Sequence, residues 1–367
     1  MPAILRRTRR TGQPGRTDIL RIFLATLILA ALAVAAACGK DEPTAVPTET
    51  PPETSPAPTL QPEPTPEIPA YRAPLTGLPV QQEITNRPFA VMINNLAPAR
   101  PQSGMTKADV VWELLAEGGI TRFVVIFQSQ EFADPIGPVR SIRPYFIEVG
   151  DFYNAIHVHA GASNDGFAIL QKQKKHDLDE ITNAGAYFWR DKSRKAPHNV
   201  YTDLEKLRAG ATKLKYPLEA SVPVMTFAEN PVLALADSAA QVEIKFQLNN
   251  YKVGYTYDPQ TEKYARFING EPHIDKNNNE QLTASNLVVI RTKHRAYDKE
   301  GRLEVDLTSG GDALLFQKGK AIACEWVREN GIIRLKKDGK ELPFVPGVTY
   351  YHVVPNASPM TDLVKYQ

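Results

Sequence analysis

Three arginines stand out among the residues of this chain that could bind a ligand. Arg140 and Arg143 follow a Gly-Pro turn three positions apart, and Arg122 precedes an apolar run at residues 123–127. If a helix begins near Ser141, a residue type that favours the N-cap, the guanidiniums of Arg140 and Arg143 share one helix face. A guanidinium is a rigid planar fork of donors that matches a carboxylate or a phosphate. These residues therefore predict an anion site.

Acidic residues near the arginines offer a second interpretation. Glu113, Glu117 and Glu148 lie in the same stretch of the chain. Ion pairs with these carboxylates would explain the arginines without any ligand, because buried charges are commonly paired inside a fold. Glu113 and Glu117, with Asp109 or Asp165, could instead hold a divalent ion or act as a base beside a phosphate. The sequence leaves these alternatives open.

Two histidines, His157 and His159, are two positions apart on an expected strand, so both face one side of it. One strand can supply two metal ligands in this way. The remaining ligands would have to come from distant residues such as Asp165, His176 or His198. We expect no metal here, because hydrogen-bonded core or ligand-contacting histidines are the commoner finding. His159 is kept as a candidate for ligand contact.

Two later segments add polar candidates. Gly161-Ala-Ser163 begins like the nucleophile elbow of an esterase, but Asp165 replaces the glycine expected two positions after the serine. The segment fits better as a helix start near Ser163 whose backbone N–H groups face an anion. Arg190 and Arg194 follow three aromatic residues and precede His198-Asn199. They could hold a glycan or a phosphate, or form a solvated face stacked on the aromatic rings.

Alternating strands and helices must position these side chains. Residues 108–116 fit a short amphipathic helix, with a strand as the competing prediction, and residues 141–149 fit a second helix. A third helical segment ends near Lys175. Short apolar runs bounded by turn signals predict strands at 89–93, 123–127 and 155–160. We therefore expect an α/β domain with a mixed sheet over residues 71–225, in which loops at the strand ends collect ligands.

Residues 226–367 are predicted to form a mainly antiparallel β domain, either a barrel or a sandwich. Turn signals such as Asn269-Gly270 and Asp338-Gly339 separate short alternating runs. The runs predict strands at 242–246, 252–257, 263–268, 287–291, 313–317, 321–328, 332–336 and 348–353. His294, in a polar loop at 293–299, could face the arginines of the first domain across a cleft.

The first 37 residues resemble a secretory signal. Residues 1–21 hold six arginines and one acid, residues 22–37 carry no charge, and Cys38 follows three alanines. This pattern is typical of a bacterial lipoprotein, in which Cys38 carries the lipid that anchors the mature protein to the membrane. An ordinary cleaved signal and an uncleaved anchor are the alternatives. Residues 38–70 contain ten prolines and predict an extended spacer between the membrane and the folded part.

The charge of the folded part argues against a nucleic-acid partner, and the cysteine content argues against a disulfide. Residues 71–367 carry 36 basic and 34 acidic side chains. The basic character of the whole chain therefore comes from its signal, and we expect no nucleic-acid partner. With Cys38 lipidated, Cys324 has no cysteine to pair with, so the fold must rely on its core rather than on a disulfide.

Four short motifs follow one another along the chain: Arg100-Pro-Gln-Ser-Gly104, Glu117-Gly-Gly-Ile-Thr-Arg122, Gly137-Pro-Val-Arg-Ser-Ile-Arg143 and Ala196-Pro-His-Asn199. In them the chain resembles the YerB-like lipoprotein family, a domain of unknown function with its own separate C-terminal domain. The resemblance covers residues 72–357 and implies an anchored extracytoplasmic bacterial protein of two domains. It supplies no reaction. We expect the polar residues of the motifs to form one site: Arg100, Gln102, Glu117, Thr121, Arg122, Arg140, Ser141, Arg143, His198 and Asn199.

The expected function is a membrane-anchored binding module that recognises an anionic or glycan component of the cell envelope. Its expected ligand-binding residues are those of the motifs together with His159, Ser163, Arg190 and Arg194. One alternative is a phosphotransferase or hydrolase that acts on an envelope precursor through the arginines and nearby acids. Another is a scaffold for a second envelope protein, with the arginines as internal ion pairs. The sequence identifies no cofactor and no catalytic residue.

Overall fold

The computed structural model describes residues 71–232 and 236–367. The predicted signal at 1–37, the predicted lipid-bearing Cys38 and the predicted spacer at 38–70 lie outside these residues. Within the two described ranges, no helix is long and apolar enough to cross a membrane.

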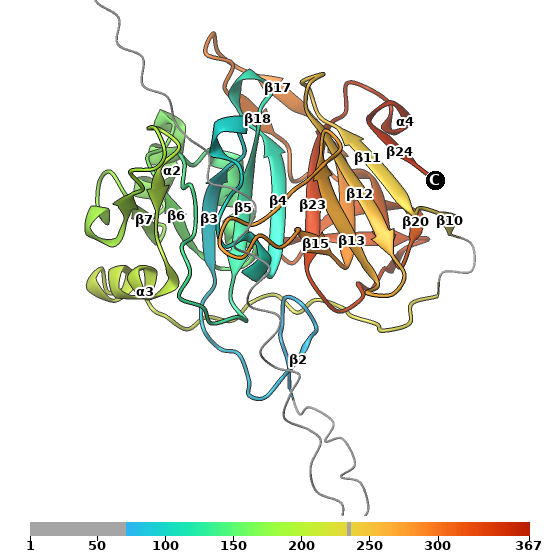
Figure 1. Ribbon diagram of the computed structural model, residues 1–367, viewed down its shortest axis with the longest axis horizontal. Coiled ribbons are helices and arrows are strands. Elements are labelled where there is room, and N and C mark those ends of the chain that lie inside the picture. Colours follow the sequence, from blue (N-terminus) through green and yellow to red (C-terminus); the bar gives the residue numbers. More distant parts are fainter. Residues whose placement is uncertain (1–70, 233–235) are drawn as a thin grey trace, which may run out of the picture. The chain divides into compact units, whose positions relative to one another are not determined.

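The N-terminal region contributes five strands of a large mixed sheet, in the order β4-β5-β3-β6-β7 (Figure 1). Strands β4, β5 and β3 pair antiparallel, whereas β3, β6 and β7 pair parallel. The strands are β3 (Phe89–Asn94), β4 (Val110–Leu115), β5 (Thr121–Phe127), β6 (Ile156–His159) and β7 (Asp177–Asp179). Helices α1 (Pro144–Phe152) and α2 (Asn164–Lys172) pack on one face, and α3 (Leu204–Lys213) packs on the other. The predicted mixed α/β region is therefore confirmed.

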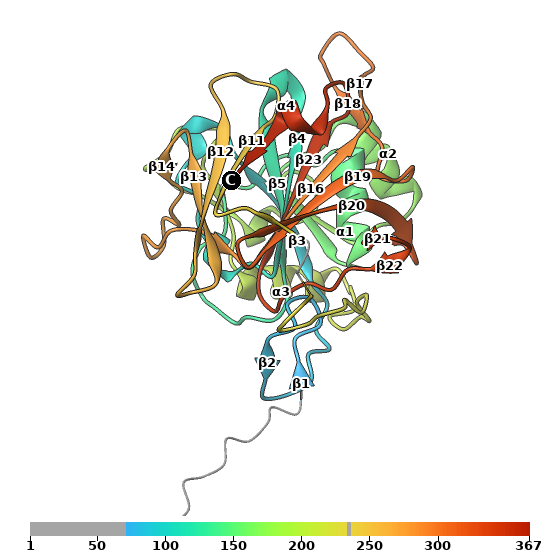
Figure 2. The ribbon, with the colours of Figure 1, turned by 90° about the vertical axis from the view of Figure 1, so that its right-hand side faces the viewer.

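The C-terminal region consists mostly of antiparallel strands in two sheets, as predicted. One group extends the large sheet: β10 (Asp237–Ser238), β16 (Asn286–Thr292), β19 (Gly311–Gln317), β20 (Lys320–Glu329), β21 (Ile332–Lys337), β22 (Lys340–Glu341) and β23 (Thr349–Pro355). The second sheet contains β11 (Gln241–Lys245), β12 (Lys252–Asp258), β13 (Lys263–Ile268), β14 (Glu271–Pro272), β15 (Thr283–Ala284) and β24 (Val364–Tyr366). Figure 2 shows this second sheet on the face of the large sheet opposite to α1 and α2.

Short elements connect and edge these sheets. Three two-stranded ribbons are β1 (Tyr71–Arg72) with β2 (Pro79–Val80), β8 (Trp189–Arg190) with β9 (Val200–Tyr201), and β17 (His294–Ala296) with β18 (Leu303–Val305). The remaining helical turns are η1 (Ala97–Ala99), η2 (Met105–Lys107), η3 (Glu117–Gly119), η4 (Gly185–Tyr187) and α4 (Met360–Leu363).

The two regions share a single sheet because β23 pairs in parallel with β4, with Thr349 opposite Val110 and Val353 opposite Leu114. On one face of this junction, the rings of Trp112 and Tyr351 stack with centroids 4.0 Å apart. Both faces of the junction are covered, so its strands carry almost continuous apolar sequence. Folding of one region therefore depends on burial supplied by the other.

The segment at 108–116 is a strand rather than the expected helix. Val111 and Leu115 belong to the core under the second sheet, whereas Trp112 and Leu114 belong to the core under α1. A strand buried on both faces has apolar residues at nearly every position, and such a run contains the spacing of a helix by chance. The competing strand prediction was the correct one.

The helix expected at 141–149 begins later, and this corrects the expected placement of two arginines. Helix α1 starts at Pro144, and its N-cap, Arg143, is extended with φ −131° and ψ 161°. A residue that precedes proline is pushed out of the helical region, whereas proline itself fits the first helical position. Arg140 and Arg143 therefore lie on an extended segment and do not share a helix face.

The strand and turn predictions in the C-terminal region are confirmed. Each predicted run overlaps one strand of the structure. At the predicted turns, Asn269 and Gly270 have φ of 53° and 87°, and Asp338 and Gly339 have φ of 51° and 74°. Two successive residues with positive φ form the hairpin turn whose twist matches the flanking strands.

Candidate functional site

A group of arginines lies at one edge of the large sheet, where β3, β4 and β6 end and β5 begins. Arg122, the second residue of β5, pairs with Asn94 at the end of β3. The carboxyl ends of parallel strands in an α/β sheet are a common place for ligands. We refer to the group as the cationic edge; it consists of Glu117, Arg122, Arg140, Arg143 and His198.

The extended segment that carries Arg140 is held between two strand ends. The backbone N–H of Arg140 donates to the Met92 carbonyl at 2.9 Å, and its carbonyl accepts from the Ala160 N–H at 3.1 Å. Nearby, the Ser141 hydroxyl donates to the Ala160 carbonyl at 2.9 Å. These bonds fix the backbone that presents the guanidinium, so ligand binding has to order only the side chain.

Arg143 and Glu117 form an ion pair at the cationic edge. The guanidinium of Arg143 holds Glu117 in a two-pronged contact in which Nη2 donates to Oε2 at 2.9 Å and Nε donates to Oε1. Burial alone would raise the pKa of Glu117, but the hydrogen bond and charge of Arg143 and the charge of Arg122 hold it below its usual value. Glu117 is therefore ionised and compensates one positive charge.

Arg122 is a buried cation, with 3% of its surface exposed. Its Nη1 donates to the Ser141 carbonyl at 2.5 Å, and its guanidinium lies 5.7 Å from the ring centroid of Phe146. Among residues 71–232 and 236–367, no group accepts a hydrogen bond from its buried Nε. Burial, followed by the charges of Arg143 and Arg140, lowers the pKa of Arg122 to about 10, so it remains charged at neutral pH.

Arg140 has no side-chain ion pair within the described residues. Burial and the charge of Arg143 lower its pKa, whereas the charge of Glu117 raises it. Beside it, His198 Nδ1 lies 2.7 Å from the Asn94 amide nitrogen, which donates and leaves the ring proton on Nε2. Burial and the charges of Arg140 and Arg194 lower the pKa of His198, so this histidine is neutral at pH 7.

The charge balance of the cationic edge is positive. Three guanidiniums share one carboxylate within the described residues. The N-terminal ends of α1 and α2, which carry partial positive charge, follow directly from Arg143 and Ser163. An anion here would receive hydrogen bonds from arginines whose backbone is already fixed.

A second polar cluster lies deeper, between the large sheet and the second sheet, and is fully buried. At its centre, Arg266 Nη2 donates to Glu113 Oε2 at 2.8 Å, and His352 Nδ1 lies 3.1 Å from the same oxygen. The other oxygen, Oε1, accepts from Tyr251 at 2.5 Å and from Thr121 at 2.7 Å. Burial would raise the pKa of Glu113, but the charge of Arg266 and the contacts of His352 and Tyr251 hold it well below its usual range.

The cluster extends to Gln102 through defined donor and acceptor roles. Arg266 Nε donates to His273 Nδ1 at 3.0 Å, so His273 Nε2 carries the proton and donates to Gln102 Oε1 at 2.7 Å. The Gln102 amide then donates to Asn95 Oδ1 at 3.0 Å. Arg100 lies at the border, with its guanidinium 5.6 Å from the Tyr251 ring centroid. Apart from the partly buried Arg100, each residue named here is buried and makes a hydrogen bond within the cluster, although His352 Nδ1 has no hydrogen-bond partner among the described residues. The cluster therefore joins the two regions.

The structure therefore separates residues that we expected in one site. Gln102 and Thr121 belong to the buried cluster, and Arg100 lies at its border. Arg194 donates to the carbonyls of Pro98 and Pro101, and Arg190 bonds Glu180 and Asn199. The expected residues that the structure brings together are those of the cationic edge, with Ser141 beside Arg140 in the chain and Arg194 close to His198.

His159 and Ser163 have roles in the fold. The fully buried His159 lies 3.0 Å from the Gly161 carbonyl through Nδ1 and 3.4 Å from Asp177 through Nε2. Ser163 caps α2 by accepting from the Gly166 N–H at 3.2 Å. Neither contact needs a ligand. Within the described residues, no group of three or more histidine, cysteine, aspartate or glutamate side chains is placed to hold a metal ion.

Sequence reasoning named Glu113 but missed its partners. Arg266 in β13 and His352 in β23 lie in ordinary alternating or apolar runs, and His273 directly follows β14. A charged residue inside an apolar strand, such as Glu113 in β4, does signal a buried counter-charge. The sequence signal for this cluster was therefore one charged residue inside a strand of each region, Glu113 and Arg266, rather than a motif.

The fold and the site define a class: an α/β region whose mixed sheet continues into a mainly antiparallel β region, with Arg122 and Arg140 at the strand ends lacking an ion-pair partner among the described residues. The model "Protein of unknown function (DUF3048) N-terminal domain" matches residues 75–217, and the corresponding C-terminal domain model matches residues 242–351. "Putative lipoprotein YerB" from Bacillus subtilis (strain 168) is 39% identical over 288 residues, covering 78% of this chain and 86% of that protein. The chain belongs to this YerB-like, two-domain family.

A solved structure supports the same assignment. The crystal structure of the YerB protein from Bacillus subtilis is similar with a TM-score of 0.75 at 37% sequence identity. The match covers 81% of this chain and 99% of that chain. The family resemblance expected from the four sequence motifs is thus confirmed.

Proposed function

We propose that this protein is an extracytoplasmic lipoprotein that binds an anionic component of the cell envelope at the cationic edge. The observation that carries the proposal is the charge balance there: three guanidiniums share one carboxylate, and the Nε of the buried Arg122 has no acceptor among the described residues. A buried cation without a counter-ion is costly, so a bound anion would complete the site.

The proposal of a membrane anchor rests on two supports. The sequence places Cys38 directly after an apolar segment and three alanines. The Bacillus subtilis relative is described as a putative lipoprotein. On this reading, residues 1–37 are the signal, residues 38–70 are the spacer, and the two domains occupy residues 71–225 and 226–367.

The test compares two arginine variants of the mature protein. Arg140→Ala removes a guanidinium of the cationic edge, whereas the control, Arg208→Ala, removes a partly exposed arginine of α3 that pairs with Glu131. Loss of one charge-assisted hydrogen bond of about 1.5–3 kcal/mol weakens binding about 10- to 150-fold. In Arg140→Ala only, we expect this loss of affinity for inorganic phosphate by calorimetry and for purified wall polymer in a retention assay. The melting temperatures of both variants should be unchanged. Equal binding by wild type and Arg140→Ala would refute the site.

A further inference from the structure

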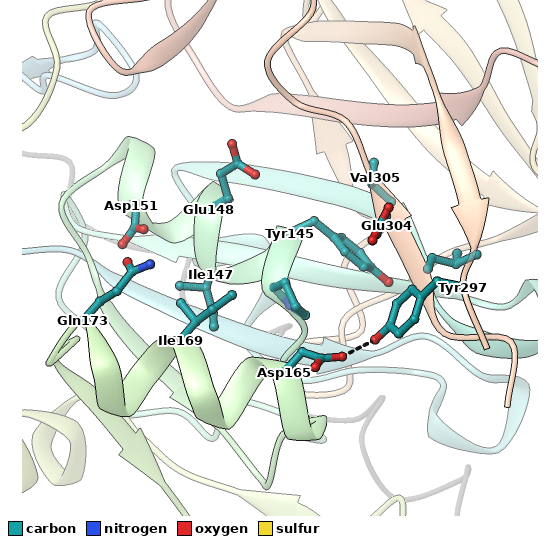
Figure 3. Close-up of a pocket in the computed structure, with 12 residues that line it drawn as sticks. Tyr145, Ile147, Glu148, Asp151, Asp165, Ile169, Gln173, Tyr297, Glu304 and Val305 are labelled. Atoms are coloured by element: carbon teal, nitrogen blue, oxygen red, sulfur yellow. Dashed lines mark hydrogen bonds between the residues drawn. The ribbon is translucent and has the colours of Figure 1, made fainter.

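A groove of about 600 Å³ lies between α1, α2 and the β17–β18 ribbon. Figure 3 shows Tyr145, Asp165 and Tyr297 at one end of the groove and Asp151 and Gln173 at the other. Pockets for small molecules commonly enclose about 300–1,000 Å³, so the groove has room for one or two sugar rings. The two helices and the ribbon come from different family domains, so the groove is built by both.

The walls of the groove combine apolar surface with hydrogen-bond acceptors. The partly exposed Ile169 and Leu303 supply aliphatic surface and Tyr297 supplies an aromatic ring, whereas Ile147 and Tyr145 are buried behind them. Four carboxylates also line it, and no lysine, arginine or histidine does. A sugar presents both an apolar C–H face and hydroxyl donors, which match apolar walls and carboxylate acceptors respectively. A phosphate group by itself finds no cationic donor among the described residues that line the groove.

The carboxylates do not form a free cation site, because each has a partner already. Glu148 pairs with Arg328, Asp151 pairs with Lys175 at 2.7 Å, and Glu304 pairs with Arg295 at 2.5 Å. The fourth, Asp165 on α2, accepts from the Tyr297 hydroxyl at 2.5 Å. The groove therefore favours a neutral, hydroxyl-rich group over an amine.

The groove and the cationic edge adjoin at the N-terminal ends of both helices. Arg143 is the N-cap of α1, and the next two residues, Pro144 and Tyr145, line the groove. Ser163 is the N-cap of α2, and Asp165 in the first turn also lines the groove. The Tyr145 hydroxyl donates to the Leu115 carbonyl at the end of β4, which ties this end of the groove to the sheet edge. One ligand could therefore place an anion on the arginines and a neutral ring between the helices.

We infer that the ligand of this site is a glycosyl phosphate: the phosphate lies on Arg122 and Arg140, and the sugar lies in the groove between α1, α2 and the β17–β18 ribbon. The inference rests on the proposed anion site and names its ligand class. Tyr297 has a defined part in it, because its contact with Asp165 holds the ribbon over the groove. A sugar that enters beneath the ribbon is enclosed by residues of both domains.

The test measures the affinities of inorganic phosphate and of a panel of hexose and N-acetylhexosamine 1-phosphates by calorimetry. Ile169→Trp fills the groove without touching the arginines, and Leu303→Trp fills it from the opposite wall should the first variant fail to fold. Lys172→Trp, an exposed position on α2 outside the groove, is the matched control. In wild type and Lys172→Trp, at least one sugar phosphate should bind tenfold or more tightly than phosphate. In the groove-filling variants this difference should vanish while phosphate binds as in wild type.

The outcomes separate the two proposals. If phosphate binds wild type but no sugar phosphate of the panel binds more tightly, the glycosyl inference is wrong and the anion site stands. A gain that persists in both groove-filling variants also overturns the inference, because the sugar must then lie elsewhere. Absence of phosphate binding to wild type, or binding that Arg140→Ala leaves unchanged, refutes the anion site itself.

Discussion

Replacing Glu113 by glutamine should destabilise the fold more than any single change at the cationic edge. Glutamine keeps the shape of glutamate, and its amide oxygen can still accept from Tyr251 and Thr121. Its amide nitrogen, however, would face the Nη2 donor of Arg266, which lies 2.8 Å from the carboxylate in the native protein. Arg266 has 0% of its surface exposed, so its charge would lose its counter-ion inside the protein.

The magnitude follows from that burial. Removing one partner of a buried ion pair costs about 3–5 kcal/mol, because the remaining charge stays desolvated. For a protein of this size class each kcal/mol shifts the melting temperature by about 2–4 °C, so the expected loss is about 6–20 °C. The stability that Glu113 contributes also depends on pH, and the pKa of Glu113 gives the direction of this dependence.

The pKa of Glu113 is held below its ordinary value of 4.5, so its contribution to stability is complete above about pH 5. As the pH falls below this value, the unfolded chain takes up the proton and the folded protein does not. Wild type should therefore lose about 1.4 kcal/mol per pH unit from this group, and the gap between wild type and Glu113→Gln should narrow.

The assay is urea and thermal unfolding of wild type, Glu113→Gln, Arg266→Met and the double variant. Glu325→Gln, the same substitution at an exposed position of β20, is the control and should change stability by less than about 0.5 kcal/mol. The double variant should lose less free energy of unfolding than the two single variants lose together, because it leaves no unpaired charge. A loss under about 1 kcal/mol in Glu113→Gln, or strict additivity in the double variant, would refute the reasoning.

Two further predictions concern the cationic edge and the shared sheet. The pKa of His198 is lowered, and a bound anion would favour its charged form. A phosphodiester, whose own charge is constant, should therefore bind more tightly as pH falls from 7 to 5. His198→Gln should abolish this trend in calorimetry, and an unchanged pH profile in that variant would remove His198 from the site. Because β23 of one region pairs with β4 of the other, thermal unfolding should give a single calorimetric transition, and two resolved transitions would contradict it.

Local chemistry was enough to predict most elements of this fold. The turns at Asn269-Gly270 and Asp338-Gly339 require positive φ, and the runs between such turns became strands. The helix prediction at 108–116 was wrong because both faces of this strand are buried, which removes the alternation of apolar and polar residues that marks a strand. The start of α1 was predictable from Pro144, since proline restricts the residue before it, but the serine N-cap signal was given more weight.

The site was predictable only in part. The motifs placed Glu117, Arg122, Arg140 and Arg143 in one group. The short connection between β4 and β5 brings Glu117 near Arg122, and backbone hydrogen bonds of Arg140 with Met92 and Ala160 hold the other motif at the same strand ends. The partner of Glu113 could not be found in this way, because Arg266 lies 153 positions away and pairs only through the packing of the second sheet. The groove beside α1 was equally hidden, since the β17–β18 ribbon that covers it belongs to the other domain.

The most direct test of the central claim is a crystal structure of the mature protein grown with phosphate or sulfate. We predict an anion within hydrogen-bond distance of the guanidiniums of Arg122 and Arg140, absent from crystals of Arg140→Ala grown in the same way. A wild-type structure in which the two guanidiniums bind protein carboxylates and no anion lies between them would contradict this prediction.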